Sequence, residues 1–166
     1  MADRKTLVVY YSRQGHTKDV AWEIARRIGA QIEVIDAGNF AHGFLWYLRA
    51  GWASLTGRDA TIAKAEHDPR DFDLVVLATP VWVGRPAPPM RSYLREHGAA
   101  LPAVACALTH GGGDASMALD KLEALAGKVP IARVMLSDIE KRSGAEPAKI
   151  VDFVAALAPH RQANAA

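Results

Sequence analysis

Five apolar or β-branched runs recur along the chain, and helical patterns separate most of them. The run at residues 74–78 is apolar at consecutive positions, which is typical of parallel strands covered by helices on both faces. This alternation predicts an α/β fold built on one doubly wound, five-stranded parallel sheet. The expected strands cover residues 6–11, 31–36, 73–79, 102–109 and 131–136, and the expected crossover helices cover 17–28, 87–96, 115–126 and 147–157.

The length and composition indicate one domain. Half of the 166 residues are hydrophobic, which suffices for one ample core, and no stretch rich in proline, glycine or serine divides the chain. We therefore predict a single domain over residues 1–166, with a frayed tail from about residue 160 onward.

Charge, hydropathy and cysteine content narrow the class of protein. The formal net charge of +2 is too small and too dispersed for nucleic-acid binding. No apolar stretch approaches the roughly 20 residues of a membrane span, and no signal-peptide pattern opens the sequence, so we expect a cytoplasmic protein. The single cysteine, Cys106, lies in an apolar run and is expected to be a buried core residue.

The segment 12–17, with the sequence Ser-Arg-Gln-Gly-His-Thr, joins the first expected strand to the first expected helix. Hydroxyl groups at Ser12 and Thr17, and the absence of a side chain at Gly15, allow backbone N–H groups to converge on a phosphate at the positive end of the helix. Neither the Gly-x-Gly-x-x-Gly spacing nor a terminal Gly-Lys-Ser/Thr is present, so the pattern favours a phosphomonoester over a dinucleotide or a nucleoside triphosphate. The alternative is an ordinary turn in which Ser12 or Thr17 caps the helix.

Two further loops, residues 79–86 and 109–114, lie at the ends of the third and fourth expected strands. Ligands of open parallel sheets bind beyond the carboxyl ends of the strands, so these loops are expected beside the segment 12–17. Trp82 offers a flat apolar surface in the first, and three glycines allow close backbone approach in the second. The alternatives are a core role for Trp82 and a simple turn ahead of a helix capped by Asp114.

Residues 40–55 combine apolar side chains at helical spacing with more aromatic rings than one face of a short helix usually buries. A crossover helix packed on the sheet is the simplest interpretation. A subunit contact that would make a homodimer, or a lid over the ligand, are the alternatives.

Taken together, these motifs resemble the flavodoxin-like superfamily, whose members bind flavin mononucleotide (FMN). The matching segments are residues 11–17, 72–86 and the glycine loop 111–113, and the resemblance extends over nearly the whole chain. It implies the strand order 2-1-3-4-5, FMN as the cofactor and NAD(P)H as the reductant. Gln14 stands where the superfamily usually has threonine, and the third loop lacks the aromatic side chain found in many flavodoxins.

The resemblance also implies which residues hold the cofactor. The phosphate is expected at the first loop, one side of the isoalloxazine ring at the second, and the pyrimidine edge of the ring at the third. The expected FMN-binding residues are Ser12, Gln14, Gly15, His16, Thr17, Pro80, Val81, Trp82, Val83, Gly84, Thr109, His110, Gly111, Gly112 and Gly113.

Two functions are compatible with this resemblance. The first is an oxidoreductase that passes hydride from NAD(P)H through FMN to a quinone or a similar small acceptor, with His110 as the candidate for orienting or protonating the substrate. The second is a flavodoxin-type one-electron carrier that docks on protein redox partners. Dedicated carriers tend to be strongly acidic, so the sequence pI of about 8.8 favours the oxidoreductase. His110 has the alternative role of a loop histidine bonded to the backbone.

Other site chemistries find no support in the sequence. The histidines at 42, 67, 97 and 160 lack the spacing of metal ligands, so we predict no metal site. The string at 110–113 is similar to the oxyanion motif of lipases, but no Gly-x-Ser-x-Gly nucleophile turn accompanies it.

Overall fold

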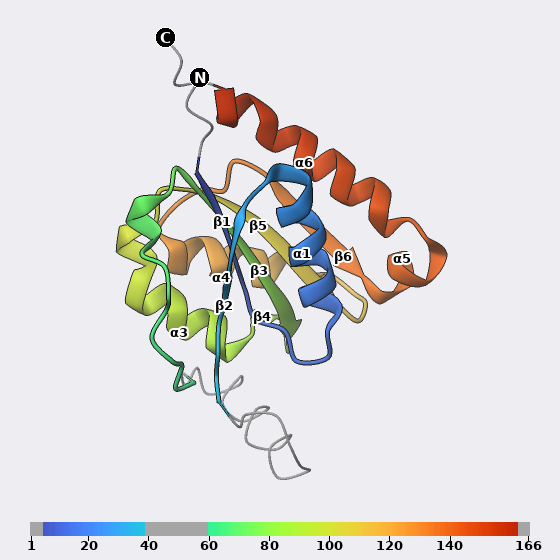
Figure 1. Ribbon diagram of the computed structural model, residues 1–166. Coiled ribbons are helices and arrows are strands. Elements are labelled where there is room, and N and C mark those ends of the chain that lie inside the picture. The colour runs from blue at the N-terminus through green and yellow to red at the C-terminus, as the bar shows by residue number, and fades with distance from the viewer. Residues whose placement is uncertain (1–4, 39–59, 163–166) are drawn as a thin grey trace.

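The protein folds as a parallel β-sheet with helices on both faces (Figure 1). This computed structural model describes residues 5–38 and 60–162, with side chains as far as residue 158. The parallel strands lie in the order β2-β1-β3-β5-β6, which is the predicted order 2-1-3-4-5 when the parallel strands alone are numbered. Their bounds are β1 (Thr6–Tyr10), β2 (Gln31–Val34), β3 (Leu74–Trp82), β5 (Ala103–His110) and β6 (Arg133–Ser137).

A short strand that the sequence did not predict, β4 (Arg85–Pro86), pairs antiparallel with the end of β3. Its register sets Trp82 opposite Arg85, so Val83 and Gly84 form a two-residue hairpin loop. The φ angles are 51° at Val83 and 65° at Gly84, the positive values that a tight β-hairpin turn requires. Strand β3 therefore continues to Trp82, past its predicted end at residue 79.

The helices form two layers. Helices α1 (His16–Ile28) and α6 (Glu146–Gln162) cover one face of the sheet, and α3 (Pro88–His97) and α4 (Ser116–Ala126) cover the other (Figure 1). All four predicted crossover helices are confirmed, and α6 continues to Gln162, past the predicted start of the tail. The sequence did not predict the short helix α5 (Asp138–Ser143) or the 3-10 turns η1 (Pro69–Asp71) and η2 (Gly98–Ala100). The predicted segment 40–55, with its dimer and lid alternatives, lies outside the described residues.

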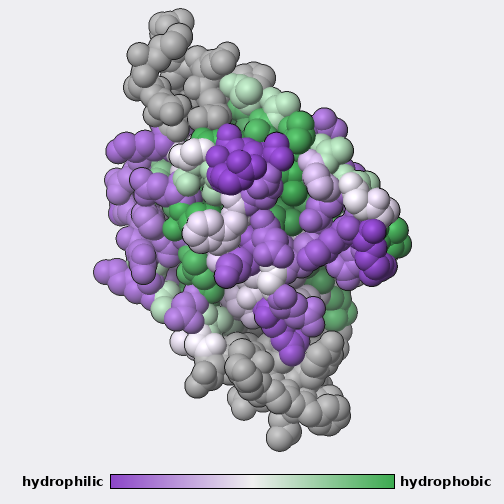
Figure 2. All heavy atoms as spheres, turned by 45° about the vertical axis from the view of Figure 1, so that its right-hand side comes forward, coloured by the Kyte–Doolittle hydropathy of each residue, from purple (hydrophilic) through white to green (hydrophobic). Residues whose placement is uncertain are grey.

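Two apolar cores fill the space between the sheet and its helix layers. Successive residues of β1 alternate between them: Leu7 and Val9 pack with α3 and α4, and Val8 and Tyr10 pack with α1 and α6. Cys106 lies in the first core, where burial raises the pKa of its thiol to about 12, so the prediction of a buried core cysteine is confirmed. The outer surface on the side of α1, α5 and α6 is mostly hydrophilic (Figure 2). Among the helices of residues 5–38 and 60–162, none has the length and apolarity needed to cross a bilayer.

Helices α3 and α4 approach each other closely at Gly98. A Cβ atom added there would lie 2.8 Å from the backbone carbonyl oxygen of Leu125. Because backbone cannot rotate away, Gly98→Ala is expected to lower the free energy of unfolding by about 1–3 kcal/mol, measured by denaturant titration. In the control Gly111→Ala the added Cβ would have Asp138 Oδ2 at 3.7 Å as its contact, and we expect a loss below about 0.5 kcal/mol. If Gly98→Ala and Gly111→Ala lowered the free energy of unfolding equally, the close approach of Gly98 to the Leu125 backbone would not explain the effect.

Helix α5 begins with a capping box. Ser137 Oγ accepts a hydrogen bond from the Glu140 N–H at 3.2 Å, and Glu140 Oε2 accepts one from the Ser137 N–H at 2.7 Å. Glu140 also pairs with Lys149. The bond from Lys149, followed by those from Ser137, lowers the pKa of Glu140 from 4.5 to about 2.

Stability is expected to depend on pH through Glu140. The pKa of its carboxyl group is lower in the folded than in the unfolded chain, so its stabilising contribution is fully present above pH 4.5 and is lost as the pH falls toward 2. Thermal unfolding should therefore show that Glu140→Gln lowers the melting temperature more at neutral pH than near pH 2. If Glu140→Gln lowered the melting temperature by the same amount at both pH values, this linkage between stability and the Glu140 carboxyl group would be ruled out.

Candidate functional site

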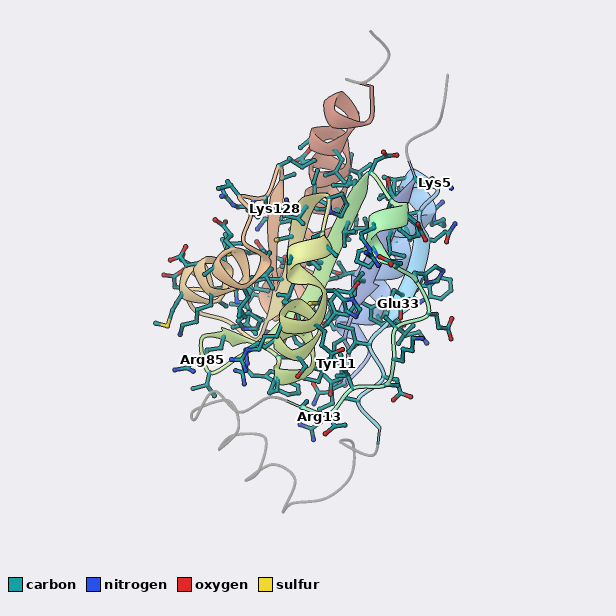
Figure 3. The ribbon with its side chains drawn as sticks, turned by 90° about the vertical axis from the view of Figure 1, so that its left-hand side faces the viewer. Lys5, Tyr11, Arg13, Glu33, Arg85 and Lys128 are labelled. Atoms are coloured by element: carbon teal, nitrogen blue, oxygen red, sulfur yellow. The ribbon has the colours of Figure 1, made fainter. Side chains whose placement is uncertain are left out.

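A cavity of about 220 Å³ lies at the edge of the sheet where the strands reach their carboxyl ends. Figure 3 shows Tyr11 and Arg13, which follow β1, at this end of the molecule, and Lys5, which precedes β1, at the other. The cavity is lined by Ser12, Arg13, Gln14, His16, Thr17, Pro80, Val81, Trp82, Thr109, His110, Gly111 and Asp138.

The cavity brings together residues from all three loops that the sequence singled out. The predicted residues that line it are Ser12, Gln14, His16, Thr17, Pro80, Val81, Trp82, Thr109, His110 and Gly111. The other predicted residues, Gly15, Val83, Gly84, Gly112 and Gly113, are absent from its lining and all have positive φ. They shape the loops that carry the lining side chains.

The loop 12–17 leaves the N-terminus of helix α1 open. Gly15 is the N-cap residue, with φ 97°, and no described side chain caps the helix, so neither Ser12 nor Thr17 has the alternative capping role. Ser12 Oγ instead accepts a hydrogen bond from the Gly15 N–H at 3.1 Å and keeps its own O–H for another acceptor. The first helical hydrogen bond runs from the Asp19 N–H to the Gly15 carbonyl, so the amides between these two residues have no acceptor within the helix.

Two hydroxyl groups join the first and third loops. Thr17 Oγ1 and Thr109 Oγ1 lie 2.7 Å apart, and both side chains are buried. Since one hydroxyl donates to the other, the second retains an O–H that can donate to a ligand. The pair thus fixes the two loops to each other and supplies the cavity with a donor.

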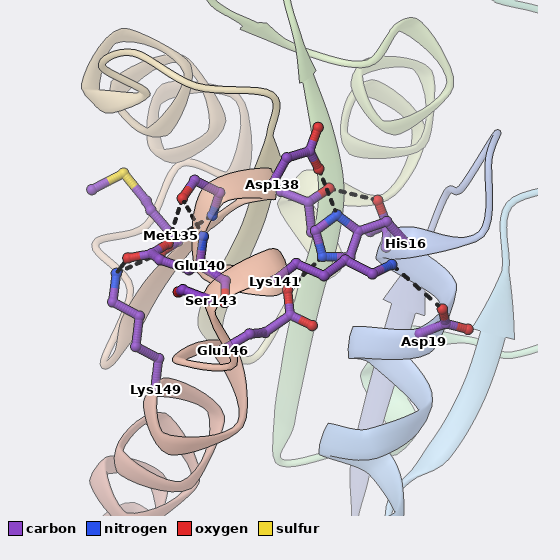
Figure 4. A network of polar contacts seen from close by, with 12 residues as sticks. His16, Asp19, Met135, Asp138, Glu140, Lys141, Ser143, Glu146 and Lys149 are labelled. Carbon is purple, nitrogen blue, oxygen red and sulfur yellow. Dashed lines mark hydrogen bonds and ion pairs between the residues drawn. The ribbon is translucent and has the colours of Figure 1, made fainter.

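His16 is held by carboxylates from the C-terminal part of the chain (Figure 4). Its Nε2 lies 2.5 Å from Glu146 Oε2, and its Nδ1 lies 3.3 Å from Asp138 Oδ1. Both ring nitrogens therefore have protein partners already. The group that His16 can offer a ligand is its backbone N–H, at the open end of α1.

Asp138 and Arg13 line the cavity but were not among the predicted binding residues. Asp138 directly follows β6 and begins α5, at the same edge of the sheet as the three loops. The rule that ligands bind beyond the carboxyl ends of the strands could have identified it, because Asp138 comes just after the expected strand 131–136. Arg13 brings a positive charge to the cavity and Asp138 a negative one.

The second loop contributes an aromatic ring. Trp82 meets Tyr11 edge to face, with the ring centroids 5.8 Å apart and an interplanar angle of 83°. Burial raises the pKa of the Tyr11 hydroxyl, and the charge of Arg13 offsets part of this effect. Trp82 packs against the core and also lines the cavity, so it combines the predicted ligand surface with the alternative core role.

The third loop presents His110 to the cavity. Its Nδ1 is buried and has no hydrogen-bond partner within the described chain, so Nδ1 does not make the backbone bond of the alternative interpretation. Asp114 does not have the alternative capping role, because the N-cap residue of α4 is Ala115 and no described side chain caps this helix. Asp114 Oδ1 instead accepts hydrogen bonds from the backbone N–H of Ser116 at 2.8 Å and from the Ser116 hydroxyl.

Comparison with known proteins gives a match in fold. No family model matches the chain, and no curated protein matches its sequence. A flavoprotein from Lactobacillus acidophilus NCFM, solved in complex with FMN, has a TM-score of 0.70 and 24% identity, over 84% of this chain and 97% of its own. A flavodoxin from Streptococcus pneumonia TIGR4 has a TM-score of 0.53 and 16% identity, over 93% of this chain and 98% of its own.

An NADH:FMN oxidoreductase solved in its apo form has a TM-score of 0.53 and 15% identity, over 95% of this chain and 88% of its own. Together with the strand order, these likenesses show that the chain has the flavodoxin-like fold, as the resemblance in its sequence predicted.

Proposed function

We propose that this protein binds FMN in the cavity and transfers hydride from NAD(P)H through FMN to a quinone or a similar small acceptor. The observation that carries the proposal is the open, uncapped N-terminus of α1 in the same cavity as an aromatic ring. FMN has a phosphate at one end and a planar tricyclic ring at the other, so the two ends match these two features. The FMN complex of the Lactobacillus flavoprotein supports the choice of cofactor.

The lining residues divide between the two ends of the cofactor. The free amides that precede Asp19, with the hydroxyls of Ser12 and Thr17, suit the phosphate. The helix dipole and Arg13 offset the negative charge that Asp138 brings to the cavity. Trp82 suits the ring, and the small residue Gly111 allows the backbone to approach its edge. FMN, when bound, supplies the hydride and electron chemistry, and the protein supplies binding and orientation.

Two observations favour an oxidoreductase over a carrier. The formal net charge of +2 gives none of the acidic character that steers dedicated carriers to basic partners. The likeness to an NADH:FMN oxidoreductase supports NAD(P)H as the reductant. The one-electron carrier is the second candidate, since the flavodoxin from Streptococcus pneumonia has the same fold. A cytoplasmic location and a homodimer through residues 40–55 stay predictions from the sequence.

The proposal is tested by titrating the purified protein with FMN and then adding NADH or NADPH without oxygen. We expect the visible spectrum of FMN to change until one FMN is bound per chain, the nicotinamide to bleach it, and a quinone to restore it over repeated turnovers. Failure to bind FMN would overturn the proposal. Binding without oxidation of NADH or NADPH, together with fast reduction by a flavodoxin reductase, would identify the carrier instead.

A further inference from the structure

His110 lines the cavity from the end of a strand. It ends strand β5, opposite Ser137 at the end of β6, and it lines the cavity beside Thr109. The next three residues, 111–113, are glycines and carry no side chain that could cover the imidazole ring. The carboxylate of Asp114, the nearest acidic residue along the chain, accepts hydrogen bonds from Ser116. These bonds, and to a smaller extent the neighbouring His110, lower the pKa of Asp114. His110 therefore lines the cavity without a covering side chain from residues 111–113.

The surroundings of Nδ1 select one tautomer of the ring. Nδ1 is buried without a hydrogen-bond partner in the part of the chain that the structure describes. A proton on Nδ1 would create a buried N–H without an acceptor, which costs about 1–3 kcal/mol and is rare in folded proteins. An unprotonated Nδ1 leaves only a lone pair, which proteins tolerate more readily. The proton of the neutral ring therefore belongs on Nε2.

We propose that His110 donates a hydrogen bond from Nε2–H to a ligand acceptor in the cavity and thereby stabilises reduced FMN relative to oxidised FMN. This inference rests on the proposed function and deepens it. The pyrimidine part of the flavin ring carries carbonyl oxygens and ring nitrogens, and negative charge gathers there on reduction. A hydrogen bond strengthens as its acceptor becomes charged, so one donor favours the reduced cofactor.

The first test determines the tautomer. Nitrogen NMR of the wild-type protein without FMN, assigned by comparison with His110→Gln, is expected to show a protonated Nε2 and an unprotonated Nδ1. Addition of FMN is expected to shift the Nε2 resonance and leave Nδ1 unprotonated. A proton on Nδ1 in the FMN complex would overturn the inference. Because the experiment uses the wild-type protein, it does not depend on whether a variant folds.

The second test compares the affinities of wild type, His110→Leu and His110→Gln for oxidised and reduced FMN. Leucine removes the donor, whereas glutamine keeps an N–H donor. We expect His110→Leu to weaken the binding of reduced FMN about 10-fold more than that of oxidised FMN, and His110→Gln to keep most of the wild-type ratio. Circular dichroism and the melting temperature verify that both variants are folded.

The outcomes separate this inference from the proposed function. The donor role would be overturned, with FMN binding intact, if folded His110→Leu kept the wild-type ratio of affinities for reduced and oxidised FMN. It would also be overturned if His110→Leu and His110→Gln lowered this ratio equally. A wild-type protein that binds no FMN would overturn the proposed function itself.

Discussion

FMN is expected to bind this protein about 100- to 20,000-fold more tightly than riboflavin, which lacks only the phosphate. The open end of α1 offers amides without a helical acceptor, and Ser12 and the Thr17–Thr109 pair each keep a hydroxyl donor. Each hydrogen bond to a charged acceptor contributes about 1.5–3 kcal/mol, so the loss of two accounts for this range. Calorimetric titration of the two flavins into the same preparation measures the difference.

Replacement of Thr17 and Thr109 together by valine is expected to reduce the ratio of the FMN and riboflavin affinities about 10-fold, because valine keeps the shape and the double variant removes the hydroxyl donor that the pair supplies. Thr6→Val is the matched control, since Thr6 Oγ1 is buried in β1 without a hydrogen-bond partner among the described residues. It should leave the ratio unchanged. Riboflavin that binds as tightly as FMN would show that the phosphate does not lie at the loop 12–17.

The parallel sheet could be predicted from the sequence because its central strands are buried on both faces. All five residues of β1 are buried, and the same holds for the first six residues of β3, so these strands are continuous runs of apolar or β-branched residues. The end of α1 could also be predicted, since Gly29 directly follows the helix. Its φ angle is 65°, a left-handed value that glycine adopts readily because it has no Cβ. The cavity followed from this topology, because parallel strands bring their carboxyl ends to one edge.

The features that the sequence did not reveal are short or depend on contacts between distant segments. Helix α5 has six residues, too few for a helical period to show. The hairpin loop of Val83 and Gly84 lacks the usual asparagine in its first position, and a β-branched residue gives no signal for positive φ. The hydrogen bond between His16 and Glu146 joins residues 130 positions apart, so no local sequence pattern predicts it.

Removal of the Glu33 carboxylate is expected to lower the free energy of unfolding by about 3–5 kcal/mol. Glu33 is only 4% exposed although it lies on β2, an edge strand of the sheet (Figure 3). Its carboxylate accepts hydrogen bonds from the backbone N–H groups of Glu66 at 3.1 Å and His67 at 2.9 Å, and it lies 2.7 Å from His67 Nδ1. Glu33→Ala leaves both amides without this acceptor, and each such loss costs about 1–3 kcal/mol.

Two further variants distinguish the bonds from the two amides from the contact with the His67 imidazole. His67→Ala removes the imidazole ring, which is 29% exposed, and keeps both backbone bonds to Glu33, so denaturant unfolding should show a loss of about 1 kcal/mol or less. Glu33→Gln keeps one oxygen as an acceptor and replaces the other with an amide donor. Its decrease in the free energy of unfolding should therefore fall between those of Glu33→Ala and His67→Ala. If His67→Ala were as destabilising as Glu33→Ala, the imidazole contact and not the amide bonds would hold the segment before η1 against β2.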